Sequence, residues 1–180
     1  MFTKLPTDTK IYALSAANPT ESSWGYYCSP NDVVQGKHIG SCLGDLFSIN
    51  FLENTESIDV NAVNLTQQFE VIQKLTTKSH VMQWGDLSFQ SDVIGDYVAN
   101  SKKYFNLKRR PFKGLFNFER PHAIDSRFIK IRTLSAIYAR EQTPEAYAEM
   151  REEMNSMQKF DDIFWHVKER LQLKGIYDPY

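Results

Sequence analysis

The spacing of apolar residues changes once along the chain, and this change restricts what the chain can fold into. Before residue 99, short apolar runs typical of strands alternate with segments of helical spacing, whereas beyond residue 125 every apolar segment has helical spacing. A chain of 180 residues, 42% of them hydrophobic, has enough apolar material for one domain with a true core, which excludes disorder. We therefore expect an α/β unit followed by packed helices.

Two segments of the first half are expected to be strands. Residues 10–17 are short and apolar and end at Asn18-Pro19, as a buried strand ends in a loop. Residues 79–84 alternate polar and apolar side chains before a Gly-Asp turn. Residues 18–42 have no steady period, so we expect a long surface loop there, and loops of this length are usually functional.

Helical spacing predicts two helices in the α/β unit, over residues 43–52 and 62–75. In the last third of the chain it predicts three more, over residues 128–138, 144–157 and 160–171. We expect these three helices to pack together as a bundle.

The start of the second of these helices has a clear local signal. Thr143 is a good N-cap residue, and Pro144 follows at the first helical position. Met150, Met154 and Met157 then recur at helical spacing. We expect this stripe to fill a core rather than to form a binding surface.

The net charge of -1 conceals a segregation of charge along the chain. Residues 1–100 carry 5 Lys and Arg against 11 Asp and Glu, whereas residues 101–120 carry 7 against 1. The basic run is interleaved with phenylalanines and has a composition suited to nucleic acid, but its flanks are not basic. We therefore expect no nucleic-acid partner, and we expect the run to dock on the acidic front of its own chain.

Other classes are excluded by what the sequence does not contain. The sequence has no run of about 18 uncharged apolar residues, so no membrane partner is expected. Its first residues lack the apolar region of a signal peptide, so this chain is expected to carry no export signal. Two cysteines without a His-rich tract do not indicate a zinc site, and we expect no metal and no cofactor.

The two cysteines leave several interpretations open. Cys28 and His38 lie in one loop and suit a thiolate with its base, although a free thiol beside a surface histidine is the more common arrangement. Cys28 and Cys42 alternatively suit a disulfide that stabilises the fold by about 3 kcal/mol. His80 alternates with apolar neighbours and is expected to be a satisfied packing residue. Asn64-Leu65-Thr66 is a glycosylation sequon, which matters only in a secreted protein.

Three local sequence motifs are more specific indicators of function than the candidate cysteine and histidine residues. They are SAANPTESSW at residues 15–24, LGDLFSINFLE at residues 43–53 and SHVMQWG at residues 79–85. In this order they closely resemble the legumain (asparaginyl endopeptidase) family of cysteine peptidases. The resemblance is strong over residues 1–90 and weaker over residues 126–173, whose helices are similar to the family's C-terminal prodomain.

The resemblance implies a partial caspase-like α/β sandwich followed by a prodomain-like helical segment that covers the active site until acid activation. In the family, the catalytic cysteine precedes a segment similar to Met1-Phe2 and Leu5-Pro6 by only a few residues, and the histidine lies further upstream. This chain contains neither match, so we expect no catalytic residue in it. Cys28 does not occupy the nucleophile position.

Part of the family's specificity pocket does have counterparts here. Ser22, Ser23 and Asp45 match the positions that line the pocket for the asparagine side chain. A carboxamide offers two N–H donors and one acceptor, so a carboxylate such as Asp45 is suited to accept one N–H. Without the resemblance, Asp45 would be interpreted as the N-cap of the helix that follows it.

These expectations define one function and one alternative. The chain is expected to supply half of a peptidase that cleaves proteins after asparagine, in a vacuole or lysosome or outside the cell. The chain is expected to have three parts: the second half of a peptidase domain (1–99), a basic linker resembling an activation peptide (100–125) and prodomain-like helices (126–180). The helices are expected to bind the peptidase part. The alternative is a non-catalytic pseudoenzyme that binds peptides or a protease.

Overall fold

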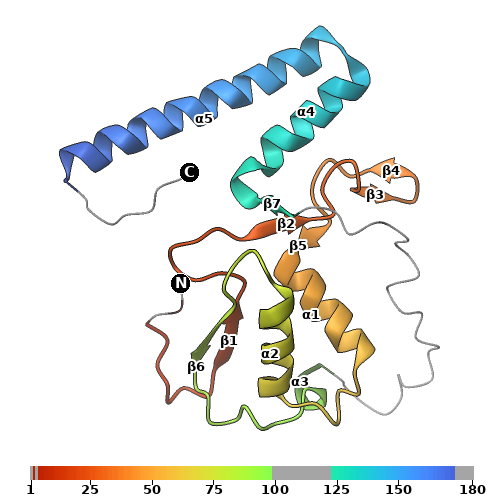
Figure 1. Cartoon of the computed structure of the whole chain (residues 1–180), viewed down its shortest axis with the longest axis vertical. Helices are drawn as coiled ribbons and strands as arrows, with labels where there is room; N and C mark the ends of the chain where they lie inside the picture. The colour runs from red at the N-terminus through yellow and green to blue at the C-terminus, as the bar shows by residue number, and fades with distance from the viewer. Residues whose placement is uncertain (1, 3, 99–122, 173–180) are drawn as a thin grey trace.

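The structure of the protein, a computed structural model, describes residue 2, residues 4–98 and residues 123–172. It contains short strands and longer helices in the order shown in Figure 1. The elements are β1 (Tyr12–Ser15), β2 (Trp24–Tyr26), β3 (Val33–Val34), β4 (Lys37–His38), β5 (Gly44–Asp45), α1 (Leu46–Ser57), α2 (Leu65–Leu75), β6 (Met82–Gly85), α3 (Gly95–Val98), β7 (Ile124–Asp125), the 3-10 turn η2 (Ser126–Phe128), α4 (Ile129–Glu141) and α5 (Pro144–Arg170). Strands and helices are mixed in the first half, which confirms the predicted α/β class.

Strands β1 and β6 pair antiparallel, with Tyr12 opposite Gly85. Both expected strands of the α/β unit are therefore confirmed, although β6 begins later than predicted. All four residues of β1 are only partly buried, so the prediction of a buried strand is wrong within the described residues. Gly85 ends the pair with φ +83°, and a Cβ there would lie 2.1 Å from the carbonyl oxygen of Ile11. Only glycine fits this position without strain.

The loop expected over residues 18–42 in fact contains the central strand of a second sheet. Strand β2 pairs antiparallel with β5 on one side and with β7 on the other. Tyr26 and Tyr27 are buried and pack with Leu46 and Ile49 of α1. The prediction of a plain surface loop is therefore wrong for this segment, which contributes to the core.

Helices α1 and α2 confirm the two helices predicted for the α/β unit. Asn64 caps α2 in a capping box with Gln67, since each side chain bonds the other's backbone N–H. The buried face of α2 carries Ile72, which is fully enclosed together with Val81 and Ile94. Helices α1 and α2 contact each other, and Figure 1 shows the β1–β6 pair beside α2 and strands β2, β5 and β7 above α1.

The last third of the described chain forms a hairpin of two helices. Thr143 caps α5 through the backbone N–H of Ala146, and Pro144 follows, as predicted. Helix α5 runs unbroken for 27 residues, so the expectation of three helices in a bundle is wrong. Residues 157–160, where two helices were expected to be separated, contain neither glycine nor proline to interrupt the helix. Met154 is 46% exposed, so the methionine stripe is not fully buried.

Candidate functional site

The serines and the aspartate predicted to form a pocket are brought to one sheet. Ser22 and Ser23 lie just before β2, and Asp45 is the last residue of β5. The register pairs Gly25 with Asp45, so Ser23 lies two residues before the partner of Asp45. Ser22 and Ser23, which precede Asp45 by 23 and 22 positions in the sequence, are thus placed with it at one end of a short antiparallel pair.

Asp45 has a structural role in this arrangement. Its Oδ1 accepts the backbone N–H of Ser48 at 2.8 Å, and its Oδ2 accepts the Ser48 hydroxyl at 2.6 Å. The alternative interpretation of Asp45 as the N-cap of α1 is therefore confirmed. Each carboxylate oxygen has a second lone pair, so capping leaves Asp45 able to accept another hydrogen bond.

Ser22 donates its hydroxyl to a residue that sequence reasoning missed. Its Oγ lies 2.7 Å from Oδ1 of Asp125 and 3.0 Å from the hydroxyl of Ser126. Asp125 is 8% exposed, and its carboxylate also accepts the backbone and guanidinium N–H groups of Arg127, with the shortest contact at 2.7 Å. Burial opposes ionisation of Asp125, but the bonds from Arg127 and Ser22 outweigh it and hold the pKa of the carboxyl below its usual value.

Strand β7 covers the free edge of β2 beside the serines. Trp24 pairs with Asp125, and the backbone N–H of Ser126 donates to the carbonyl of Ser23 at 3.0 Å. The segment that carries Ser22 and Ser23 therefore lies against the chain that leads into α4. The available sequence signal was an aspartate two residues before an arginine at a helix start, but it does not reveal a partner about 100 residues away.

A second carboxylate fixes the other end of this segment. Glu21 accepts the backbone N–H of Asn18 at 2.8 Å and that of His80 at 2.6 Å, and its Oε2 lies 2.8 Å from Nδ1 of His80. Burial opposes ionisation of Glu21, but these bonds outweigh it and lower its pKa. The side chain of His80 is 78% exposed, so His80 is satisfied as predicted but is not a packing residue.

Both cysteines of the chain form one disulfide, Cys28–Cys42. The interpretation of Cys28 as a thiolate with His38 as its base is therefore wrong, because Cys28 has no free sulfur. His38 instead lies 2.7 Å from Asp32, which is almost fully buried and also accepts the backbone N–H of Gly40. Burial raises the pKa of Asp32, but the bonds from His38 and Gly40 outweigh it and the net shift is downward.

Some expectations concern residues outside the described part of the chain, including the basic run of residues 101–120. Within the ranges that the structure describes, no group of three or more His, Cys, Asp or Glu side chains is arranged to hold a metal ion. In the same ranges, no helix has both the length and the apolar composition to cross a lipid bilayer.

Comparison with known proteins agrees with the sequence motifs. The profile of the Peptidase C13 family matches residues 1–115. The vacuolar-processing enzyme of Vicia sativa is 36% identical over 101 residues, which are 54% of this chain and 20% of that protein. The delta-isozyme of Arabidopsis thaliana is 35% identical over 107 residues (57% and 23%), and the legumain of Canavalia ensiformis is 32% identical over 97 residues (50% and 20%). The chain spans about a fifth of the length of these relatives. The resemblance to legumains is thereby confirmed, and the chain belongs to the Peptidase C13 family.

Proposed function

We propose that this chain contributes the asparagine-binding part of a C13 cysteine endopeptidase and lacks the catalytic cysteine and histidine. The observation that carries the proposal is the pairing of β2 with β5, which puts the Ser22-Ser23 segment and Asp45 at one end of a sheet. The match to the Peptidase C13 family supports peptide-bond hydrolysis as the activity, and the name vacuolar-processing enzyme supports a vacuole as the location.

The chemistry of these groups suits a carboxamide. The free lone pairs of Asp45 accept an N–H of the asparagine side chain. The Ser23 hydroxyl, and the Ser22 hydroxyl once it is released from Asp125, either donate to the side-chain oxygen or accept its second N–H. An apolar side chain in the same place covers the remaining acceptor sites of Asp45 and the serines without giving them a further hydrogen bond, and a lost bond of this kind costs about 1–3 kcal/mol. Selection for asparagine is therefore expected from the additional hydrogen bonds that only a carboxamide makes here.

The proposed absence of a nucleophile is supported by the disulfide. Cys28 and Cys42 bond to each other, so neither sulfur is a thiolate able to attack a peptide carbonyl. A disulfide of this kind also suits an oxidising compartment on the secretory route rather than a reducing one. The chain alone is therefore expected to bind peptides without cleaving them.

The helices after β7 are proposed to regulate this pocket. Asp125 holds the hydroxyl of Ser22, and η2 and α4 follow directly, so displacement of β7 frees Ser22 and moves the helices away together. Because the pKa of Asp125 is lowered, acid weakens this contact only when the pH falls to that lowered value. This behaviour matches a prodomain-like segment that is released by acid.

Binding of the peptide acetyl-Ala-Ala-Asn-amide, followed by NMR, tests the proposal. We expect the amide resonances of Ser22, Ser23 and Asp45 to shift with the asparagine peptide and not with the corresponding leucine peptide. Asp45→Asn preserves the N-cap but replaces a carboxylate oxygen with donors, so binding is expected to weaken at least tenfold. Asp59→Asn, at an exposed turn aspartate, is the matched control.

An activity assay separates the proposal from its alternatives. A fluorogenic asparagine peptide, tested from pH 4 to 8, is expected to show no turnover with the chain alone. Turnover by the purified chain contradicts the absence of a nucleophile. Equal binding of the asparagine and leucine peptides contradicts the pocket and favours a general peptide-binding or protease-binding protein.

A further inference from the structure

The triplet Asn64-Leu65-Thr66 plays no part in the proposed function. N-linked glycosylation requires an asparagine, then any residue except proline, and then serine or threonine. This is the one triplet of that kind in the 180 residues of the chain. The surroundings of Asn64 in the structure distinguish a usable acceptor from a triplet that is enclosed in the fold.

Asn64 follows an exposed turn. In this turn Asp59, Asn61 and Ala62 are exposed, and the backbone N–H of Ala62 donates to the carbonyl of Asp59 at 3.0 Å. Asn64 itself is partly exposed, and its backbone forms an antiparallel bridge with Val93. A sugar attached to this side chain therefore starts from the surface of the folded chain.

The two polar atoms of the Asn64 side chain differ in what they contact. Oδ1 accepts the backbone N–H of Gln67 at 2.8 Å and caps α2. Nδ2 donates to no group among the residues that the structure describes. The atom that glycosylation modifies is thus the one that the fold leaves available.

The chemistry of attachment preserves the cap. A bond forms between Nδ2 and the anomeric carbon of the oligosaccharide, while the bond from that carbon to a lipid diphosphate carrier breaks. The diphosphate leaves with the bonding electrons, and Nδ2 releases one proton. The product is still an amide with the same carbonyl oxygen, so Asn64 continues to accept the N–H of Gln67.

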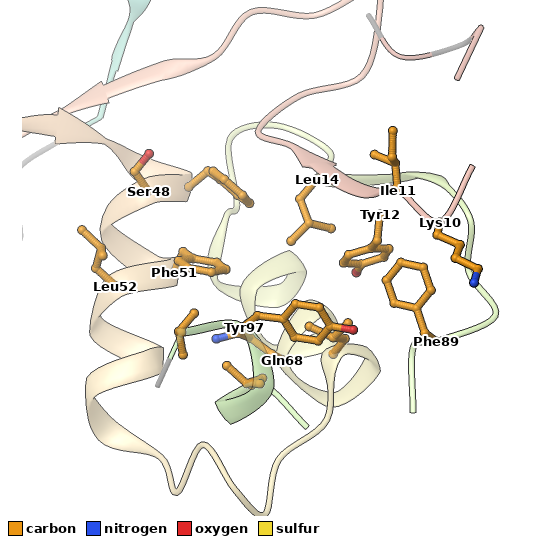
Figure 2. Close-up of a pocket in the computed structure, with 14 residues that line it drawn as sticks. Lys10, Ile11, Tyr12, Leu14, Ser48, Phe51, Leu52, Gln68, Phe89 and Tyr97 are labelled. Atoms are coloured by element: carbon orange, nitrogen blue, oxygen red, sulfur yellow. The ribbon is translucent and has the colours of Figure 1, made fainter. Parts of the chain in front are cut away.

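The inward side of α2 is not disturbed by a group on Asn64. An apolar hollow of about 800 Å³ lies beside this helix, and Figure 2 shows Phe51 and Gln68 among the side chains around it. Leu65 and Gln68 line the hollow, whereas Asn64 does not. Gln68 is 3% exposed and donates to Thr55 at 2.9 Å. An oligosaccharide on Asn64 therefore stays outside the hollow and leaves these contacts in place.

The disulfide is an independent observation that points to the same modification. The bond between Cys28 and Cys42 suits an oxidising compartment on the secretory route. Secreted proteins receive their N-linked oligosaccharides on this route, from a transferase and a lipid-linked sugar donor. The inference thus rests on the location proposed above, but it does not depend on asparagine recognition.

A second asparagine provides a comparison within the chain. Asn18 is also followed two residues later by a threonine, but Pro19 stands between them and excludes transfer. Oδ1 of Asn18 accepts the backbone N–H and the hydroxyl of Thr20 at 2.9 and 3.0 Å. This triplet therefore has only the local role of an Asx turn.

We propose that Asn64 is an acceptor site for an N-linked oligosaccharide. The glycan covers the exposed turn before α2, and Asn64 remains the cap of this helix. A bulky polar group at this position increases the solubility of the surface around the turn.

Expression of the full chain behind a cleavable secretory leader in eukaryotic cells tests the inference. We expect the chain to carry one oligosaccharide, which an N-glycosidase removes with conversion of Asn64 to aspartate. Peptide mass spectrometry locates this conversion, and Asn18 is expected to be unmodified. Thiol labelling of the same sample reports the disulfide, which shows that the chain has entered the oxidising compartment.

Three variants separate the glycan from the cap. Thr66→Ala removes the hydroxyl that the triplet requires and is expected to abolish the glycan, whereas Thr66→Ser is expected to retain it. Asn64→Asp also loses the glycan but keeps an oxygen that caps α2. Amide hydrogen exchange at Gln67 is therefore expected to be the same in the glycosylated wild type and in Asn64→Asp.

Three results overturn the inference. They are a disulfide-bonded wild-type chain without a glycan, a glycan that persists in Thr66→Ala, and faster exchange at Gln67 in the glycosylated chain than in Asn64→Asp. The last result means that the glycan breaks the cap. None of these measurements involves peptide binding, so their failure is distinguishable from failure of the proposed asparagine pocket.

Discussion

The carboxylate of Glu21 accepts two hydrogen bonds from His80, a residue 59 positions further along the chain. This contact joins two of the three motifs by which the sequence resembles legumains. It fixes the start of the segment that carries Ser22 and Ser23 against the residues that lead into β6. The pair therefore couples the segment before β2 to the segment before β6, two parts of the chain that are distant in sequence.

Replacing this carboxylate is expected to destabilise the protein in a pH-dependent way. The pKa of Glu21 is lowered, so its contribution is present above the ordinary glutamate value of about 4.3 and is lost as the pH falls through the lowered value. Glu21→Gln should lower the free energy of unfolding by about 1 kcal/mol at pH 6, and by progressively less as the pH falls below about 4. Urea denaturation at pH 6 and at a series of lower pH values measures this, with Glu70→Gln at an exposed position of α2 as control. A pH-independent loss contradicts the electrostatic role.

Asp125→Asn is expected to loosen β7. The carboxylate accepts bonds from Ser22 and Arg127, and bonds to a charged group contribute about 1.5–3 kcal/mol each. Exchange of the Ser126 amide, which donates to the Ser23 carbonyl, should become at least tenfold faster at pH 6. In the wild type the same acceleration should appear only as the pH falls below about 4, because the pKa of Asp125 is lowered.

The control for this experiment is Asp92→Asn, since Asp92 also bonds a hydroxyl, that of Tyr97, but lies away from β7. The freed Ser22 should also strengthen binding of the asparagine peptide in Asp125→Asn. Unchanged exchange at Ser126 would mean that β7 is held by its backbone pairing alone.

Reduction of the disulfide is expected to destabilise the fold without giving the chain peptidase activity. The bond between Cys28 and Cys42 closes a loop with a sequence separation of 14, and cross-links of this size contribute about 3 kcal/mol. Urea denaturation with and without a phosphine reductant measures the difference. The Cys28→Ala, Cys42→Ala double variant should match the reduced protein and be insensitive to the reductant. Equal stability of wild type in both buffers contradicts the bridge.

Two glycines provide a matched test of backbone strain. Gly85 and Gly36 both have positive φ, +83° and +80°, but a Cβ at Gly85 would collide with the Ile11 carbonyl, whereas one at Gly36 meets nothing within 4 Å. Gly36→Ala should cost about 1 kcal/mol from the left-handed conformation alone. Gly85→Ala should cost at least about 2 kcal/mol more, because the backbone of β6 must move away from Ile11 at the end of the β1–β6 pair. Similar losses in the two variants, measured by urea denaturation, contradict the close approach.

The features that sequence predicted well are those determined by nearby residues. Helices α1 and α2 have their apolar faces and their caps, Asp45 and Asn64, within a few positions of one another. The start of α5 at Thr143-Pro144 is equally local. Periodicity and capping chemistry suffice for such elements.

The features that sequence missed depend on distant partners. Strand β2 has three residues and shows no alternation, so only its pairing with β5 and β7 identifies it. The bond from Ser22 to Asp125 spans 103 positions, and no local pattern encodes it. In contrast, the pocket positions came from resemblance to a family, and their role remains a prediction.

The α4–α5 hairpin has a mechanical consequence. At 1.5 Å per residue, the 27 residues of α5 form a rod about 40 Å long, supported by an α4 of half that length (Figure 1). Ile129, at the base of α4, lies close to Gly25 of β2, next to the segment that carries the serines. A tilt of about 10° at that base displaces one end of a rod of this length by about 7 Å relative to the other. A rotation of the hairpin about its base, beside the segment that carries Ser23, would therefore produce a displacement of several ångströms along α5, which a pair of fluorescent labels can follow.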